Sequence, residues 1–285
     1  MHLIIHMGFH KTGTTWLQHL LNLNHEALVA RGIWYEPKDG YPAHHQEAWR
    51  LLRGDMGPIA ELADHAQAAG CTTILLSSED LEGVVVNRQI ALDIEQAARN
   101  AGVETVTWHV TLREPGAYFA SLYAQLQHHI YADPLEMFFE VIRKGVLFRP
   151  EPLPGQDGTP YWFYCFDYAP LLQAFAADGH RVMLHDYEDC DPFPAWRMID
   201  GLGALDALTI QPDPSGRNSR LDDAAVAAGY RKRMLHALGS EADYGRISDI
   251  VDRHVEIGFD SVDRLAEIVG ERFVESYRTL VQPSG

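Results

Sequence analysis

An apolar run that turns at once into a loop of small residues stands at the start of the chain and constrains it most. Leu3–His6 has the composition of a buried strand, and the loop after it carries Gly8 and Gly13 at the spacing G-x-x-x-x-G. The apolar spacing of Trp16 and the leucines after it predicts a helix. A strand, a glycine-containing loop and a helix N-terminus form an anion-binding unit, because the N–H groups of the first helical turn point at the ligand.

The loop differs from the P-loop of a nucleotide triphosphatase in the position of its lysine. A P-loop needs Lys directly after the second glycine, but Thr14 stands there, and the lysine is Lys11, inside the loop. Lysine is scarce in this chain, so its place in the loop is informative. We predict that the backbone N–H groups from Thr12 to Thr15 hold a 5′-phosphate, and that Lys11 meets negative charge on the bridging oxygen of a transferring group.

The loop and the start of the helix have the sequence Lys11-Thr12-Gly13-Thr14-Thr15-Trp16. This sequence resembles the 5′-phosphosulfate-binding loop, K-S/T-G-T-T-W, of sulfotransferases that use 3′-phosphoadenylyl sulfate (PAPS). The resemblance implies a P-loop-like sulfotransferase fold, with all six residues at the donor nucleotide and Trp16 packed on the adenine. The alternatives are an ordinary glycine turn and, for Trp16, a place in the apolar stripe of the helix.

A second motif begins where the predicted strand Thr105–Leu112 ends. Arg113 follows this strand directly, and Ser121 stands eight positions later, in a helix expected over Tyr118–Gln127. Both side chains can therefore converge on one anion at the end of the strand. The spacing is similar to the 3′-phosphate-binding motif of the same sulfotransferases. A salt bridge of Arg113 and a hydroxyl on the helix face are the structural alternatives.

Two later segments resemble the family more loosely. Val182–Asp189 is typical of a strand that ends in Tyr-Glu-Asp, and the resemblance implies that Tyr187 lies near the adenine. Pro214–Ser219 is similar to a late loop that closes over the 3′-phosphate, and Arg217 is its expected ligand, although the family's R-K-G pattern is absent. The alternatives are a half-buried aromatic side chain at a strand end and a polar turn.

The proton acceptor of the reaction is expected after the predicted strand Thr73–Leu76. Glu79 stands there, at a position similar to one where the vertebrate cytosolic sulfotransferases carry a catalytic histidine. A carboxylate within hydrogen-bond reach can take the proton from an acceptor hydroxyl, so Glu79 and Lys11 are the predicted catalytic residues. His44 and His45 compete with Glu79 for this role. The structural alternative places Glu79 in the first turn of the next helix, where acidic residues are favoured.

Strand-like runs alternate with helical patterns along the chain. The remaining segments of this kind are a strand over Arg181–His185 and a helix over Arg88–Ala101. The alternation predicts an α/β fold with a mainly parallel central sheet flanked by helices. We expect a single domain over residues 1–285 with a helical C-terminal part from about 220 to 285, and loops over Ile33–Pro37 and Arg149–Pro160.

The composition argues against several classes of partner. A net charge of −17 is unfavourable for binding nucleic acid or an anionic membrane, and no apolar run reaches the length of a membrane span. The 3 cysteines lie far apart without a C-x-x-C pair, and the 15 histidines lack metal-ligand spacing, so neither a disulfide framework nor a metal site is expected. We expect a cytoplasmic protein.

The resemblance implies a PAPS-dependent sulfotransferase, most simply an O-sulfotransferase, and covers roughly residues 1–219. An acceptor hydroxyl, or as second choice an amine, attacks the sulfur in line, and no metal is required. The acceptor is expected to be a small molecule or a carbohydrate. Two alternatives stay open: a P-loop nucleotide kinase or NTPase, and a catalytically inactive nucleotide-binding protein of the same fold.

Overall fold

The computed structural model describes residues 1–37, 40–126, 134–149, 161–210 and 241–281, and single positions between 224 and 235. From 241 to 261 it describes the backbone, together with the exposure of Gly245. Arg217 lies outside the described residues, as do residues 150–160 of the predicted long loop.

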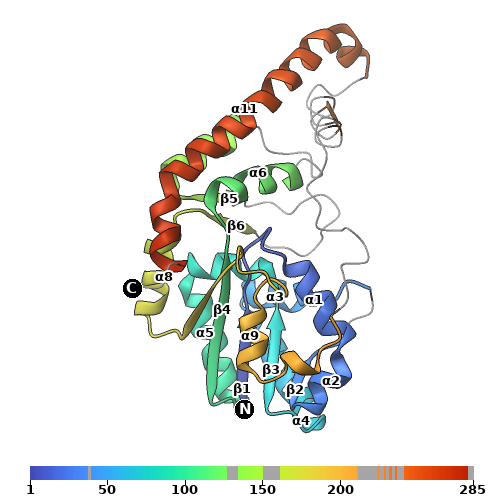
Figure 1. The fold of residues 1–285 in the computed structure, drawn as a ribbon, viewed down its shortest axis with the longest axis vertical. Helices are drawn as coiled ribbons and strands as arrows, with labels where there is room; N and C mark the ends of the chain where they lie inside the picture. Colours follow the sequence, from blue (N-terminus) through green and yellow to red (C-terminus); the bar gives the residue numbers. More distant parts are fainter. Residues whose placement is uncertain are drawn as a thin grey trace.

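The central sheet has five parallel strands in the order β2-β3-β1-β4-β7 (Figure 1). They are β1 (His2–His6), β2 (Ile33–Tyr35), β3 (Thr73–Ser77), β4 (Thr105–Leu112) and β7 (Val182–Asp186). Since all five strands run in the same direction, their carboxyl ends lie at one edge of the sheet, where ligands of such sheets bind. This confirms the predicted α/β class and the parallel central sheet.

Alternate residues of β1 face opposite sides of the sheet and belong to two separate hydrophobic cores. Leu3 and Ile5 pack with α3 (His45–Leu52), α4 (Gly57–Ala68) and α5 (Arg88–Asn100). Ile4 packs on the other side with α1 (Thr14–Leu23), α2 (His25–Ala30) and α9 (Trp196–Gly201). All three β1 side chains are buried, and each contributes about 1.5–3 kcal/mol by leaving water. Helices therefore cover both faces.

A second group of helices lies beyond the carboxyl edge of the sheet (Figure 1). It consists of α6 (Pro115–Leu126), α7 (Pro134–Lys144) and α11 (Glu241–Val281), with the antiparallel pair β5 (Val146–Arg149) and β6 (Trp162–Cys165). Helix α8 (Tyr168–Ala177) lies beside the sheet, where Phe175 packs on Trp108 of β4 with ring centroids 5.4 Å apart. Helix α11 packs on α6, α7 and α8. A Cβ at Gly116 of α6 would lie 2.5 Å from the carbonyl oxygen of Ala266, so a glycine is needed where these two helices meet.

The sequence predicted the long buried strands but missed the short ones. The predicted loop over Ile33–Pro37 is wrong at Ile33–Tyr35, which forms the edge strand β2 and pairs with β3. Ile33 and Tyr35 are buried and Trp34 is half-buried, but three residues are too few for a recognisable alternation. Among the described residues, no helix combines the length and the apolar character needed to cross a membrane.

Candidate functional site

The loop between β1 and α1 lies at the carboxyl edge of the sheet and has an unusual backbone. Lys11 has φ 64° and Gly13 has φ 79°, both in the left-handed region. Gly13 is also the N-cap of α1, and a Cβ there would lie 2.7 Å from Cγ of Pro194, so only glycine fits. The Thr12 hydroxyl donates to the carbonyl of Phe9 at 2.5 Å, which closes the loop.

The start of α1 leaves a row of backbone donors open. Within the described part of the chain, the N–H groups from Thr12 to Thr15 donate no hydrogen bond, whereas those of Trp16 and Leu17 donate to the carbonyl of Gly13 at 3.1 and 3.3 Å. Open donors at a helix N-terminus, with the positive end of the helix dipole behind them, form an anion site. The sequence predicted the N–H groups of these four residues as phosphate donors, and the binding of a phosphate there stays a prediction.

Two cations flank these donors. Nη1 of Arg113 donates to the carbonyl oxygen of Lys11 at 2.9 Å, so the two residues are in direct contact. Burial lowers the pKa of the Lys11 ammonium and the charge of Arg113 lowers it further, while Glu79 acts in the opposite direction. Nε of Arg113 is buried and has no hydrogen-bond partner among the described residues. A bound anion would relieve the repulsion between the two cations.

The structure brings Tyr187 to the same place. Its ring lies under the Arg113 guanidinium at 4.8 Å, and a Cβ on Gly13 would lie 3.6 Å from it. Ser121 is half-buried on α6, the helix that starts two residues after Arg113. Trp16 is half-buried and packs on Phe193 with ring centroids 5.0 Å apart, as expected for a residue of the helix's apolar stripe.

Glu79 lies on the other side of the loop, at the start of the 3₁₀ helix η1 (Glu79–Val85). It is half-buried, and its Oε2 accepts a hydrogen bond from Nε2 of Gln18 on α1 at 3.0 Å. Its negative charge acts on Lys11 and on His45. The carboxylate is therefore close enough to both the loop cation and the α3 histidine to influence their titration.

The two competing histidines have different environments. His44 is 0% exposed, and its Nδ1 accepts a hydrogen bond from the Ser77 N–H at 3.2 Å. His45 Nδ1 donates to Oδ2 of Asp80 at 2.7 Å. Burial alone would lower the pKa of His45, but Glu79 and Asp80 raise it to about 9. His45 is therefore a cation near pH 7, and His44 has no exposed surface for an acceptor.

A buried network of carboxylates and histidines lies at this edge of the sheet, and the sequence did not reveal it. Asp80 accepts hydrogen bonds from His45, from Trp49 Nε1 at 2.6 Å and from Trp162 Nε1 at 3.1 Å. Glu82 accepts from His10 Nδ1 at 2.8 Å. The one trace of the network in the sequence is the acidic run of η1, which follows β3 at the same edge as the loop and does not by itself show burial.

The only residue of this region with a large exposed aromatic face among those described is Tyr41, which is 45% exposed. Its hydroxyl hydrogen-bonds to that of Thr15 at 2.8 Å, and its ring stacks on His45, which stacks in turn on Trp49. Through Tyr41 the stack contacts the start of α1, and through His45 it lies within the electrostatic influence of Glu79.

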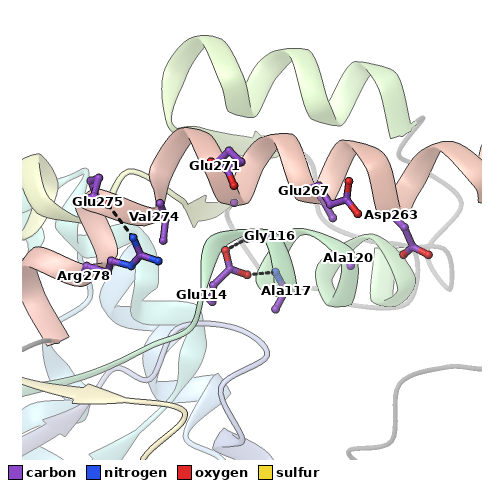
Figure 2. A pocket seen from close by; sticks show the side chains of 12 residues that line it. Glu114, Gly116, Ala117, Ala120, Asp263, Glu267, Glu271, Val274, Glu275 and Arg278 are labelled. Atoms are coloured by element: carbon purple, nitrogen blue, oxygen red, sulfur yellow. Dashed lines mark hydrogen bonds and ion pairs between the residues drawn. The ribbon is translucent and has the colours of Figure 1, made fainter.

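A groove of about 710 Å³ between α6 and α11 is a separate feature (Figure 2). The Glu114 carboxylate on its wall accepts from the N–H groups of Gly116 at 2.9 Å and Ala117 at 2.6 Å, and so caps α6. The other ionisable residues of the lining are Asp263, Glu267, Glu271, Glu275 and Arg278. Since carboxylates dominate, the groove is unsuited to an anionic nucleotide, and the loop is the better candidate site.

Among the described residues, no group of three His, Cys, Asp or Glu side chains is arranged to hold a metal ion. Comparison of the chain with protein-family models, with curated proteins and with solved structures gave no match. What the site does is therefore argued from its own geometry and chemistry.

Proposed function

We propose that the protein is a PAPS-dependent sulfotransferase, and that its parallel sheet is that of the P-loop-like sulfotransferase fold. The single observation that carries the proposal is the set of open N–H donors at the start of α1 with Lys11 and Arg113 beside it. A nucleotide with separate 5′- and 3′-phosphate groups needs two anion sites near one another. The loop offers one, and the guanidinium group of half-buried Arg113 offers the other.

The cations, backbone N–H groups and aromatic side chains at this edge suit the phosphate groups and the adenine of PAPS. In our proposal the N–H groups of Thr12 to Thr15 hold the 5′-phosphosulfate, and Arg113 with Ser121 holds the 3′-phosphate. Tyr187 and Trp16 lie beside the adenine, and Arg217 is the expected ligand from the late loop. Lys11 belongs to the loop and its backbone carbonyl accepts a hydrogen bond from Arg113, so in our proposal it lies next to both phosphate sites.

When bound, PAPS would supply the sulfuryl group and leave as adenosine 3′,5′-bisphosphate. Lys11 stabilises the negative charge that grows on the bridging oxygen, an interaction that strengthens as the bond breaks. Glu79 accepts the proton of the acceptor hydroxyl. The contacts favour Glu79 over its competitors, because His44 is fully buried and His45 is already protonated near pH 7.

A thermal-shift titration tests the proposal. We expect adenosine 3′,5′-bisphosphate to raise the melting temperature more than ATP with Mg²⁺ does, because only the former presents a 3′-phosphate to Arg113. Incubation with PAPS carrying labelled sulfate and pooled hydroxyl acceptors should then give labelled product. Stabilisation by ATP with Mg²⁺ alone would instead identify a kinase or NTPase, and binding without transfer to any acceptor would identify an inactive nucleotide-binding protein.

A further inference from the structure

Glu82 of η1 has no exposed surface, yet it carries an ionisable carboxyl group. Its oxygens accept from Tyr118 of α6, from the backbone N–H of Cys165 in β6 at 2.5 Å, and from two donors of His10. A buried carboxylate is tolerated only when hydrogen bonds replace its lost hydration. Glu82 meets this condition with donors from three separate elements.

His10 connects this carboxylate to the phosphate-binding loop. Its backbone N–H and its Nδ1 both donate to Oε2 of Glu82, at 3.0 and 2.8 Å. Its other ring nitrogen lies 3.8 Å from Oδ1 of Asp80, and its ring meets Tyr164 edge-on. Burial would lower the pKa of His10, but Asp80 and Glu82 raise it to about 10. His10 is thus fixed by its main chain and its side chain at once.

The next residue is Lys11, whose backbone is left-handed. A non-glycine residue keeps such a conformation only where its surroundings determine it. On the amino side of Lys11 the fixed point is His10. On its carboxyl side the fixed point is the Arg113 contact to the Lys11 carbonyl.

We propose that Glu82 is the positioning residue of the phosphate-binding loop: anchored by α6 and β6, it clamps His10 and thereby sets the backbone conformation of Lys11 and the direction of the open N–H groups. The effect on sulfuryl transfer rests on the proposed function. The effect on the loop does not. Glu82 touches no reacting group, so it acts through His10.

The chain offers a matched control for this role. Glu95 on α5 accepts from His180 Nδ1 at 2.6 Å and from Trp108 Nε1 at 2.9 Å, so it forms a similar carboxylate–histidine pair. Neither partner belongs to the loop. Glu82→Gln and Glu95→Gln therefore remove the same kind of charge from a histidine, and only the first should alter the loop.

The experiment compares the full-length protein and both variants by amide NMR, hydrogen exchange and calorimetry with adenosine 3′,5′-bisphosphate. In Glu82→Gln we expect the amide of His10 to exchange at least about tenfold faster and the amides of Lys11 to Thr14 to shift, because an amide nitrogen cannot accept a hydrogen bond. Nucleotide affinity should fall, and kcat should fall by about 100-fold. Glu95→Gln should leave all of these unchanged.

Tyr118→Phe is a second, milder variant that tests the same role if Glu82→Gln does not fold. It removes only one donor to Glu82, at 3.1 Å, and should shift the same loop amides by a smaller amount. If neither variant changes the loop more than Glu95→Gln does, the positioning role is wrong. If the wild-type protein does not bind the nucleotide, the proposed function is wrong, while the loop amides still decide the role of Glu82.

Discussion

The two halves of the carboxyl edge of the sheet differ in how far their polar groups are hydrogen-bonded. In the loop half, around Lys11 and Arg113, backbone donors and a buried guanidinium nitrogen have no acceptor among the described residues. In the network half, around Asp80 and Glu82, each carboxylate accepts at least three hydrogen bonds. Unpaired donors beside positive charges favour the binding of an anion. Carboxylates with all their hydrogen bonds made hold the surrounding residues in one conformation. In our proposals the first half binds the ligand, and the second half fixes the backbone of the first.

Glu79 lies at the boundary of the two halves, and its variant should have the largest effect. Glu79→Gln keeps the shape and the contact with Gln18 but cannot accept a proton, so kcat should fall by about 10²- to 10⁴-fold while donor affinity is retained. Steady-state kinetics with calorimetry measures both. His45→Gln serves as the comparison. If it abolishes turnover while Glu79→Gln does not, the histidine is the base.

Lys11→Ala tests whether the loop half acts on the reaction or only on binding. We expect kcat to fall by about 10²- to 10³-fold and nucleotide affinity to fall less, because the ammonium contact strengthens as charge develops. Lys144→Ala is the control, since that side chain is exposed and pairs with Glu140. A kcat near that of the wild type would remove Lys11 from the mechanism.

Arg113→Ala tests the second anion site of the same half. Affinity for adenosine 3′,5′-bisphosphate should fall by about 2–4 kcal/mol, because a charge-assisted contact is lost. Adenosine 5′-phosphate lacks the 3′-group, so its affinity should change much less. Calorimetry with both ligands gives the difference. An equal loss for the two would mean that Arg113 only supports the loop, through its bond to the Lys11 carbonyl.

The sequence singled out the residues of the loop half but not the contacts of the network half, for a physical reason, and ligand binding by the loop half stays a prediction. The loop is continuous, so Lys11 and Gly13 are recognisable from local spacing, and Arg113 directly follows a long buried strand. Glu82 and His10 lie 72 positions apart and meet only because β1 and β3 are neighbours in the sheet. Acidic residues after a strand are also common at helix starts, so their sequence alone does not show that they are buried.

The same contrast divides the histidines. His10 and His45, in the network half, have pKa values raised to about 10 and about 9 by their carboxylates, against the effect of burial. His6, His109 and His185 lie together on β1, β4 and β7, where burial lowers their pKa values to about 3, 3 and 4. His109 and His185 are hydrogen-bonded to each other at 2.8 Å. Burial thus makes a histidine neutral unless a carboxylate is buried with it.

These opposite shifts predict a stability maximum near pH 6.5. His10 and His45, with raised pKa values, stabilise the folded protein fully below pH 6.5, the pKa of a histidine in the unfolded chain. This stabilisation is lost as the pH rises through 9 to 10. His6, His109 and His185 have lowered pKa values, so the free energy of unfolding decreases as the pH falls from 6.5 toward 4 and 3. In that range the unfolded chain binds protons at these histidines and the folded chain does not. Each such histidine gives a slope of at most about 1.4 kcal/mol per pH unit.

Urea unfolding at a series of pH values measures the two limbs separately. His45→Gln should flatten the limb between pH 6.5 and 9 and leave the limb between pH 6.5 and 4 unchanged, because His45 is charged in the folded state at least up to pH 9. Below pH 4 the variant also changes the titration of Asp80, whose pKa His45 lowers. His109→Gln should flatten the acid limb only, since its histidine is neutral in the folded protein. If His45→Gln instead changes the limb between pH 6.5 and 4, His45 is not protonated in the folded protein near pH 7. The contrast between charged histidines in the network half and neutral histidines in the sheet would then be wrong.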